Sequence, residues 1–290
     1  AGLARLNACS EVIWASTFDS HHSVFRDHEG NFWVSGYELV KEDSPRAGLF
    51  PPIKPPFSEE TLLQVSPDGK LLQRISLLEA LYNSPWRHLL WHYNRIRDPE
   101  RLDILHLNDV EVLPPGLAQQ YPSLEAGDIV VSSRSLSSIA VLSGSGEIKW
   151  LMPGVFTVQH DPDFEADGWI TVFDNRDDWS MHKGRFLGGS QIRAVNPATN
   201  EVRDVYDSAL GGEVFYTRAG GKHQLLANGN RLITEAKAAR IFEITPQGET
   251  VWEWIAEPYD EKRVFDVLEG TRYPDISAET TAAWACMEDR

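Results

Sequence analysis

The sequence predicts an all-β protein, and more specifically a β-propeller built from four-stranded units. The main observation is a repeat: four segments each have a His-bearing entry, a glycine turn, an alternating strand and two further strands. The 290 residues also include 10 Trp and 17 Pro, which fit many short strands joined by turns better than a helical bundle. A lone four-stranded meander cannot bury its faces, so such units must pack on one another. A β-sandwich is the alternative architecture.

The repeats follow one another along most of the chain. The four units are HHSVFRDHEGNFWVSGYELV with LLQVSPDGKLLQRI, HLNDVEVLP with GDIVVSSRSLSSIAVLSGSGEIKWL, QHDPDFEADGWITVFDN with SQIRAVNPATNEVRDVY, and KHQLLANGNRLITEAKAARIFEITPQGETVWEW. Their turns, such as SPDGK and TPQGE, place Gly or Asn where a tight hairpin needs positive φ. The N-terminal LARLNACSEVIW matches only the last two strands of a unit, which gives four and a half units. We therefore expect one domain over residues 1–290, with sequence missing upstream.

Three insertions interrupt the strands. Residues 45–56 form a Pro-rich excursion, and residues 176–189 form a polar loop. In residues 76–97 the apolar positions recur at helical spacing, which predicts one or two short helices. None of these segments has the composition of a flexible linker, so the single-domain interpretation stands.

Composition excludes several classes of partner. A net charge of −16 argues against nucleic acid, which requires a basic surface, and disfavours anionic membranes. No apolar stretch is long enough for a membrane span. No signal peptide is visible at Ala1, so the protein is either cytosolic or already processed after export. The sequence contains no P-loop or GxGxxG motif, so it does not indicate a nucleotide cofactor.

The histidines at the strand entries are the candidate functional residues. In a propeller the first strand of each blade lies nearest the axis, so equivalent entries open at one rim of the central channel. His22 or its neighbour His21, His106, His160 and His223 occupy those entries. The remaining histidines have no repeat equivalent and are expected to be ordinary surface or loop residues; they are His28, His88, His92 and His182.

Clustered histidines suit three chemistries: transition-metal binding, general acid–base catalysis and nucleophilic attack by imidazole. Arg134, in the β-segment VVSSRSLSSI, helps to choose among them. A guanidinium near the funnel would bind a tetrahedral oxyanion through charge-assisted hydrogen bonds and would repel a metal dication. Histidine with arginine therefore favours sulfuryl or phosphoryl chemistry.

Three segments carry a family resemblance: QHDPDFEADGWITVFDN, GDIVVSSRSLSSIAVL and LLANGNRLITEAKAARIFEITPQGETVWEW. They resemble the bacterial arylsulfate sulfotransferases, and the likeness runs from about His21 to Trp254. It implies a six-bladed propeller exported to the periplasm or secreted. It also implies an enzyme that moves a sulfuryl group from an aryl sulfate to a phenol without nucleotide sulfate donor, cofactor or metal.

The resemblance assigns roles to particular residues. It implies that His160 in VQHD is transiently sulfated, that His22 and His106 lie at the entries of earlier blades, and that Arg134 binds the sulfate. The candidate catalytic residues are thus His160, His106, His22 and Arg134, and the candidate substrate-binding residues are His21, Asn108, Asp161 and His223. The sequence departs from the family in showing four and a half units instead of six. It also has Asp161 where a small hydroxylated residue is expected.

Two other functions fit the same residues. One is a ligand-binding propeller that has kept the scaffold and lost the chemistry. The other is a metal-assisted hydrolase in the same funnel, with the histidines joined by Asp109 or Asp161. The sequence specifies neither the natural donor and acceptor nor the oligomeric state.

Cys9 and Cys286, the two cysteines, lie near the two ends of the chain and have no metal-binding spacing. A propeller commonly closes by pairing strands from its two ends, which would bring both cysteines to one side of the molecule. An exported protein could join them in a disulfide. The alternative is that Cys9, which replaces the usual glycine of a hairpin turn, is exposed and free.

Overall fold

The computed structural model describes residues 2–51, 53–91, 102–179, 184, 186–207, 212–261, 263–273, 281 and 286, without the side chain of His22. Within these residues, four four-stranded antiparallel sheets and one two-stranded sheet form an all-β propeller fold. The four and a half units counted in the sequence are therefore confirmed. The described residues do not contain the six blades that the resemblance implied.

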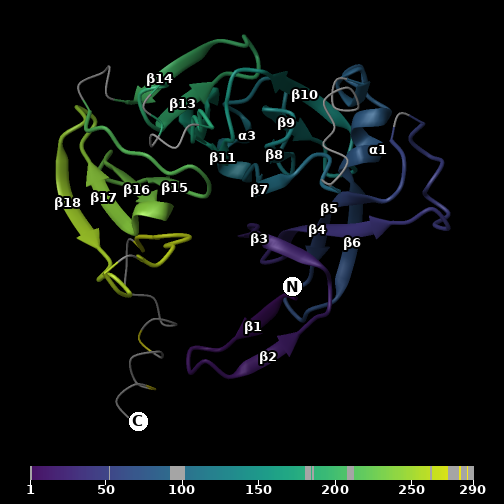
Figure 1. Ribbon diagram of the computed structural model, residues 1–290, viewed down its shortest axis with the longest axis horizontal. Coiled ribbons are helices and arrows are strands. Elements are labelled where there is room, and N and C mark those ends of the chain that lie inside the picture. The colour runs from purple at the N-terminus through teal and green to yellow at the C-terminus, as the bar shows by residue number, and fades with distance from the viewer. Residues whose placement is uncertain are drawn as a thin grey trace.

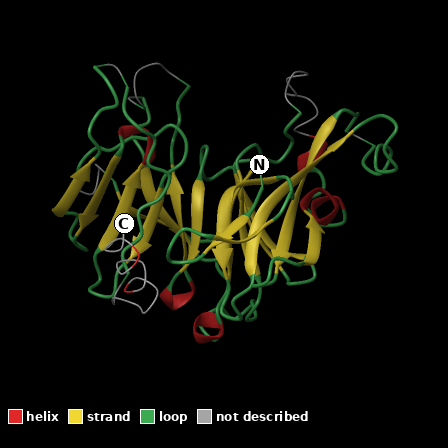
Figure 2. Cartoon of the chain, turned by 90° about the horizontal axis from the view of Figure 1, so that it is seen from below, coloured by secondary structure: helices red, strands yellow, loops and turns green. Residues whose placement is uncertain are grey.

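Each blade uses four consecutive strands. Their bounds are β3 Ser20–Arg26, β4 Phe32–Val40, β5 Phe57–Val65 and β6 Leu71–Ser76; β7 Leu107–Val112, β8 Ile129–Ser133, β9 Ser138–Leu142 and β10 Ile148–Pro153; β11 His160–Phe164, β12 Ile170–Asp174, β13 Gln191–Val195 and β14 Val202–Tyr206; and β15 Lys222–Leu225, β16 Arg231–Glu235, β17 Arg240–Ile244 and β18 Thr250–Ile255. The blades follow an arc around the centre, with β3, β7, β11 and β15 innermost (Figure 1). Seen from the side, the strands run between two faces that carry the loops (Figure 2).

Burial explains why these segments form blades. Strands β9, β12 and β16 are buried at every position, whereas the outer strand β18 is exposed throughout. Successive side chains of a strand point to opposite faces, so a middle strand of a blade serves two cores at once. In β12, Ile170 and Val172 pack against the second blade, while Phe173 packs against the fourth. The hydrophobic core is thus divided among the contacts between neighbouring blades.

A glycine turn shows how closely the blades approach one another. Gly146 lies in the SGSGE turn between β9 and β10 with φ of 93°. A Cβ at this position would lie 2.6 Å from Cγ2 of Ile75 in the preceding blade. Both the positive φ and the close contact therefore require glycine here.

The helices are short and belong to the insertions. Helix α1, Leu77–Tyr82, confirms the helix expected in residues 76–97, and residues 92–101 lie outside the described part. Ser76 caps α1 by accepting a hydrogen bond from the Glu79 N–H. The sequence interpretation missed three single-turn elements: α3 Pro115–Ala118, η1 Ala166–Gly168 and η3 Ala236–Ala238. Their short length leaves no periodic pattern to detect.

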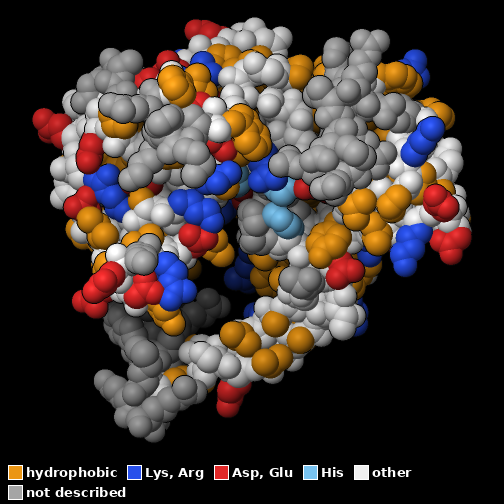
Figure 3. Space-filling view, viewed as in Figure 1, with side chains coloured by type: hydrophobic (Ala, Val, Ile, Leu, Met, Phe, Trp, Pro, Cys, Tyr) orange, Lys and Arg blue, Asp and Glu red, His pale blue; other side chains and the backbone are white. Residues whose placement is uncertain are grey.

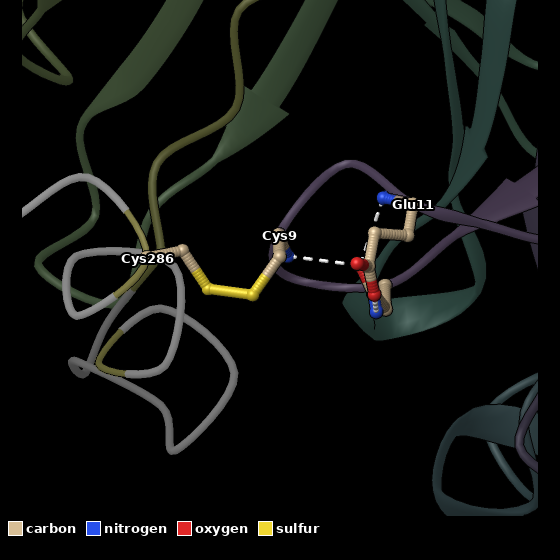
Figure 4. Close-up of a disulfide and its surroundings, with 4 residues drawn as sticks. Cys9, Glu11 and Cys286 are labelled. Carbon is tan, nitrogen blue, oxygen red and sulfur yellow. Dashed lines mark hydrogen bonds between the residues drawn. A yellow bond between two sulfur atoms is a disulfide. The ribbon is translucent and has the colours of Figure 1, made fainter. Parts of the chain in front are cut away.

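The two ends of the chain are joined by a disulfide rather than by described strand pairing. Strands β1, Ala4–Leu6, and β2, Val12–Ala15, pair only with each other. In their connecting turn, Cys9 is bonded to Cys286, with the two Cα atoms 5.4 Å apart (Figure 4). The expectation that Cys9 could be a free thiol is therefore wrong. A disulfide between distant residues is compatible with an extracellular, oxidising location.

The helices of the described residues are all too short or too polar to cross a lipid bilayer.

Candidate functional site

The histidines lie at strand entries, as the repeat predicts. His160 is the first residue of β11, His106 directly precedes β7, and His21 and His223 lie within β3 and β15. The pairing register shifts near the start of β3, β7 and β11, whereas β15 pairs regularly. An irregularity of this kind re-aims the side chains beside it. His106, just before β7, has a φ of 48°, in the left-handed region.

One cavity of about 280 Å³ brings four of the predicted groups together. His21, His106, Arg134 and His160 line it. The segment Ala219–Lys222, Lys237 and the carboxyl groups of Asp109 and Asp266 also line it. The space-filling view shows histidine side chains near the centre of this face, with Lys and Arg side chains beside them (Figure 3). The predicted role of His22 falls on a side chain outside the described part, and it is the neighbouring His21 that lines the cavity.

Arg134 reaches the cavity from a turn rather than from the middle of a β-segment. Strand β8 ends at Ser133, and the Arg134 N–H donates to the carbonyl oxygen of His106 over 3.0 Å. In an antiparallel pair the end of one strand lies beside the start of its partner, so the Arg134 turn and the His106 entry share one rim. The Arg134 Nη2 lies 3.1 Å from Nδ1 of His106.

The hydrogen bonds of His160 define one tautomer. The side-chain amide of Asn175 donates to the carbonyl oxygens of Thr217 and Gly220, over 2.8 and 2.7 Å. That orientation points the Asn175 Oδ1 at Nδ1 of His160, 2.7 Å away. Nδ1 therefore carries the proton, and Nε2 carries the lone pair. The residue is only 2% exposed, so this arrangement is protected from bulk water.

The lone pair of His160 already has a donor. The backbone N–H of Gly220 donates to Nε2 over 3.2 Å. Gly220 and Gly221 both have positive φ, of 70° and 103°. A group that reacts with Nε2 must therefore take the place of the Gly220 N–H, because an imidazole nitrogen has a single in-plane lone pair.

The backbone before His160 is held by the preceding blade. Asn108, which is fully buried, donates to the carbonyl oxygen of Gln159 over 2.7 Å, and Ser132 Oγ donates to the same oxygen over 3.0 Å. Ser132, two residues before Arg134, thus has a structural role. Through its contact with Gln159, Asn108 positions the backbone that leads to His160, and its predicted contact with the substrate stays a prediction.

His106 belongs to a chain of carboxyl groups that the sequence did not reveal. Its Nδ1 is hydrogen-bonded to Asp103 Oδ2, and Asp103 is hydrogen-bonded to Glu60. Burial, followed by the hydrogen bond with Asp103, holds the pKa of Glu60 well above its ordinary value. Burial opposes ionisation of Asp103 too, but hydrogen bonds with His106 and Glu60 outweigh it and lower its pKa. The geometry therefore fits a protonated Glu60, an ionised Asp103 and a proton on His106 Nδ1.

A second cavity adjoins the first. It has a volume of about 460 Å³ and shares His21 and His106 with the cavity that contains His160. The two shared rings lie edge to face, with centroids 5.3 Å apart. Apolar side chains line much of its remaining wall, among them Tyr37, Leu39, Leu102 and Leu107.

Asp161 and His223 lie away from the first cavity, in an ionic network. Asp161 accepts hydrogen bonds from the backbone N–H and Nδ1 of His223, over 2.5 and 2.7 Å. Its other oxygen lies 3.0 Å from Lys222 Nζ, which also contacts Asp109 over 3.0 Å. Burial opposes ionisation of Asp161, but Lys222 and His223 lower its pKa. These contacts lie within the protein, and the predicted contact of Asp161 and His223 with the substrate stays a prediction.

Two of the remaining histidines behave as expected, since His28 and His88 are exposed. His92 and His182 lie outside the described residues.

The chain was compared with curated proteins and with solved structures. Among curated proteins, the sequence has no significant match. Among solved structures, a protein of unknown function from Bacteroides caccae is similar at 13% identity and a TM-score of 0.52, over 84% of this chain and 71% of that one. A streptogramin B lyase is 12% identical, with a TM-score of 0.45, over 84% of this chain and 57% of that one. Virginiamycin B lyase from Staphylococcus aureus is also 12% identical, with a TM-score of 0.43, over 88% and 60%.

At 13% identity, the similarity to the Bacteroides caccae protein concerns the fold alone. The sequence itself gives the more specific finding, because residues 2–257 match the family model described as Arylsulfotransferase (ASST). That match includes every strand of the four blades and of the N-terminal hairpin. The chain therefore belongs to the arylsulfotransferase family.

Proposed function

We propose that this protein transfers a sulfuryl group from an aryl sulfate to a phenol, with His160 as the nucleophile. The observation that carries the proposal is the tautomer of His160. Asn175 holds the proton on Nδ1, which leaves the Nε2 lone pair at a cavity that Arg134 and His106 also line. A neutral imidazole with a fixed lone pair is the form that attacks an electrophile.

In the first half-reaction, one bond forms and one bond breaks. His160 Nε2 attacks the sulfur of the aryl sulfate, and an N–S bond forms as the S–O bond to the aryl group breaks. The bonding electrons leave with the phenolate oxygen, which then takes a proton. In the second half-reaction an acceptor phenol loses its proton, its oxygen attacks the same sulfur, and the N–S bond returns its electrons to Nε2.

Arg134 and His106 have complementary roles in this scheme. The Arg134 guanidinium carries a permanent positive charge at the rim and stabilises the sulfuryl oxygens. His106 is oriented through Nδ1 by Asp103. As an imidazolium it gives its Nε2 proton to the leaving phenolate, and the neutral ring that results takes a proton on Nε2 from the acceptor phenol. Asp103 acts through His106 and is a positioning residue.

The second cavity suits the aromatic part of the substrates. His21 and His106 separate it from the cavity of His160, and its wall includes Tyr37, Leu39 and Leu107. An aryl group placed there would leave its sulfate near the histidines. The substrates are small molecules, and the chemistry above uses no nucleotide donor or cofactor. The disulfide supports a periplasmic or secreted location.

A binding propeller without catalysis is the second candidate. The Gly220 N–H donates to the nitrogen that must react, and a scaffold that only binds ligands would keep this hydrogen bond. Transfer requires the segment at Gly220 and Gly221 to release Nε2 when substrate enters.

The experiment is incubation of the protein with 4-nitrophenyl sulfate, with and without phenol, in the presence and absence of EDTA. Phenol-dependent release of 4-nitrophenolate, insensitive to EDTA and absent in His160→Ala, is the expected result. Release without phenol that EDTA abolishes would indicate a metal-assisted hydrolase. Saturable binding of 4-nitrophenyl sulfate without turnover would indicate a binding propeller.

A further inference from the structure

The cavity of His160 has charged side chains that the proposed mechanism does not use. Among the described residues, its wall includes cationic and anionic side chains, those of Arg134, Lys222, Lys237, Asp109 and Asp266. The charge of Lys222 is already balanced, because its Nζ lies 3.0 Å from both Asp109 and Asp161. Besides Arg134, the charge offered to a ligand in this cavity therefore depends on Lys237 and its partner.

Lys237 lies in the turn of the fourth blade that corresponds to the turn of Arg134 in the second blade. Arg134 lies between β8 and β9, and Lys237 belongs to η3, between β16 and β17. Each turn joins the second strand of its blade to the third. In an antiparallel pair the end of the second strand lies beside the start of the first, so both turns open at the rim of the entry histidines. The repeat thus places a second cation at the rim where Arg134 is proposed to bind sulfuryl oxygens.

Asp266 is the partner of Lys237. Its Oδ2 lies 2.5 Å from Lys237 Nζ. Asp266 belongs to the segment that follows β18 and turns back beside η3 (Figure 1), where the Val267 N–H donates to the carbonyl oxygen of Ala236 over 3.1 Å. This backbone contact, one residue from each partner, holds the carboxylate beside the ammonium group at the cavity.

The ion pair is exposed, so its carboxylate can be exchanged. The Lys237 side chain is 43% exposed and that of Asp266 is 48% exposed. Ion pairs in contact with water stabilise a fold little, because hydration competes with them. An anionic ligand that replaces Asp266 exchanges one oxyanion contact of Lys237 for another, and the released carboxylate is hydrated. A carboxylate that stays on Lys237 instead occupies the ammonium group and repels the ligand.

We propose that Lys237 binds the sulfate group of an aryl sulfate as it enters the cavity of His160, and that Asp266 is an internal competitor that the substrate displaces. This inference rests on the proposed function, because it takes that cavity as the sulfate site. An anionic ligand gains the contact with Lys237, whereas a neutral aromatic ligand of the same shape does not. The pair therefore makes the cavity selective for anions.

The test is isothermal titration calorimetry with 4-nitrobenzenesulfonate, an anion that has no ester oxygen to lose and so cannot transfer its sulfuryl group. The uncharged 4-nitrobenzenesulfonamide is the neutral probe of similar shape. The variants are Lys237→Met, Lys237→Arg, Asp266→Asn and the double variant Lys237→Met/Asp266→Asn. Glu257→Gln is the matched control, because Glu257 is an exposed carboxylate of the same segment. Circular dichroism verifies that all variants are folded.

We expect Lys237→Met to weaken sulfonate binding about 3–10-fold, and Lys237→Arg to keep it within about twofold of the wild type. Asp266→Asn should tighten this binding about 3–5-fold, the upper range for an exposed ion pair. In the Lys237→Met background the same change should have an effect below about twofold, since no ammonium group remains to be released. Glu257→Gln should leave sulfonate binding within about twofold, and the sulfonamide should bind all variants within the same range.

The proposal is overturned by lack of sulfonate binding at millimolar concentration, by unchanged affinity in Lys237→Met or Asp266→Asn, by equal weakening in Lys237→Met and Lys237→Arg, or by an equal gain from Asp266→Asn in both backgrounds. These measurements require no turnover, so they can be separated from the proposed function. Phenol-dependent transfer by the wild-type protein together with any of these results would refute the roles of Lys237 and Asp266 alone. The expected affinities without any transfer would refute the proposed function alone.

Discussion

Removal of the disulfide between Cys9 and Cys286 gives a prediction whose size follows from the chain length. The two residues are separated by 277 positions, so the bridge closes nearly the whole chain into one loop. In the chain-entropy model, a loop of this length lowers the entropy of the unfolded state by an amount worth about 5.6 kcal/mol at 25 °C. Measured disulfide contributions are smaller, about 2–4 kcal/mol. We expect the double variant Cys9→Ser/Cys286→Ser to lose about 2–5 kcal/mol of unfolding free energy.

The assay is urea unfolding of the wild-type protein and the double variant, followed by tryptophan fluorescence and by circular dichroism. The bridge acts on global unfolding only if the hairpin stays attached to the first blade in the native state. Trp14 Nε1 and Arg5 Nη1 both donate to the carbonyl oxygen of Pro67, over 3.0 and 2.8 Å, which provides that attachment. A loss below about 1 kcal/mol, with coincident transitions for the two probes, would refute this reasoning.

Three further predictions concern single residues. Arg134→Ala should lower the transfer rate about 10²–10³-fold, the scale for loss of one stabilising donor, and near-normal kcat would contradict its role. Asp103→Asn should slow transfer from phenyl sulfate about 10²–10⁴-fold because His106 loses its orienting carboxylate, but should affect 4-nitrophenyl sulfate little, since that leaving group needs no proton. Burial raises the pKa of Asp174 from 3.8 to about 6, although the hydrogen bond from the Thr157 N–H and the charge of Arg193 act to lower it. The protonated carboxyl of Asp174 therefore stabilises the fold fully below pH 3.8, and this contribution is lost as the pH rises through about 6. We expect the unfolding free energy of the wild-type protein, measured with urea, to fall by about 3 kcal/mol over this range. The variant Asp174→Asn should not show this fall.

The blade structure could be predicted because each unit repeats its own turn chemistry. The sequences SPDGK, SGSGE, NPATNE and TPQGE each mark a hairpin between the last two strands of a blade. The entry histidines could be predicted for the same reason, since a repeated position in sequence becomes a repeated position around the axis. The sequence does not decide whether the two cysteines form a disulfide, because disulfide geometry depends on the positions of both residues in space, which no local pattern gives.

The supporting residues of the site could not be predicted, because their contacts arise between blades. Asn175 follows β12 and looks like an ordinary strand end, yet it sets the tautomer of His160. Asp103 lies in an insertion with no repeat equivalent, and Lys222 has no distinguishing motif. Asp161 is a further example, since the sequence places it next to His160 but does not reveal its contacts with Lys222 and His223 in the following blade.

The most direct test of the central claim is the intact mass of the protein after brief incubation with 4-nitrophenyl sulfate in the absence of phenol. The proposed mechanism predicts a gain of one sulfuryl group, located at His160 by peptide mapping, that disappears when phenol is added. His160→Asn, which keeps a polar side chain of similar reach, should show no gain. Phenol-dependent transfer by the wild-type protein without any covalent gain, or an equal gain in His160→Asn, would contradict the assignment of His160 as the nucleophile.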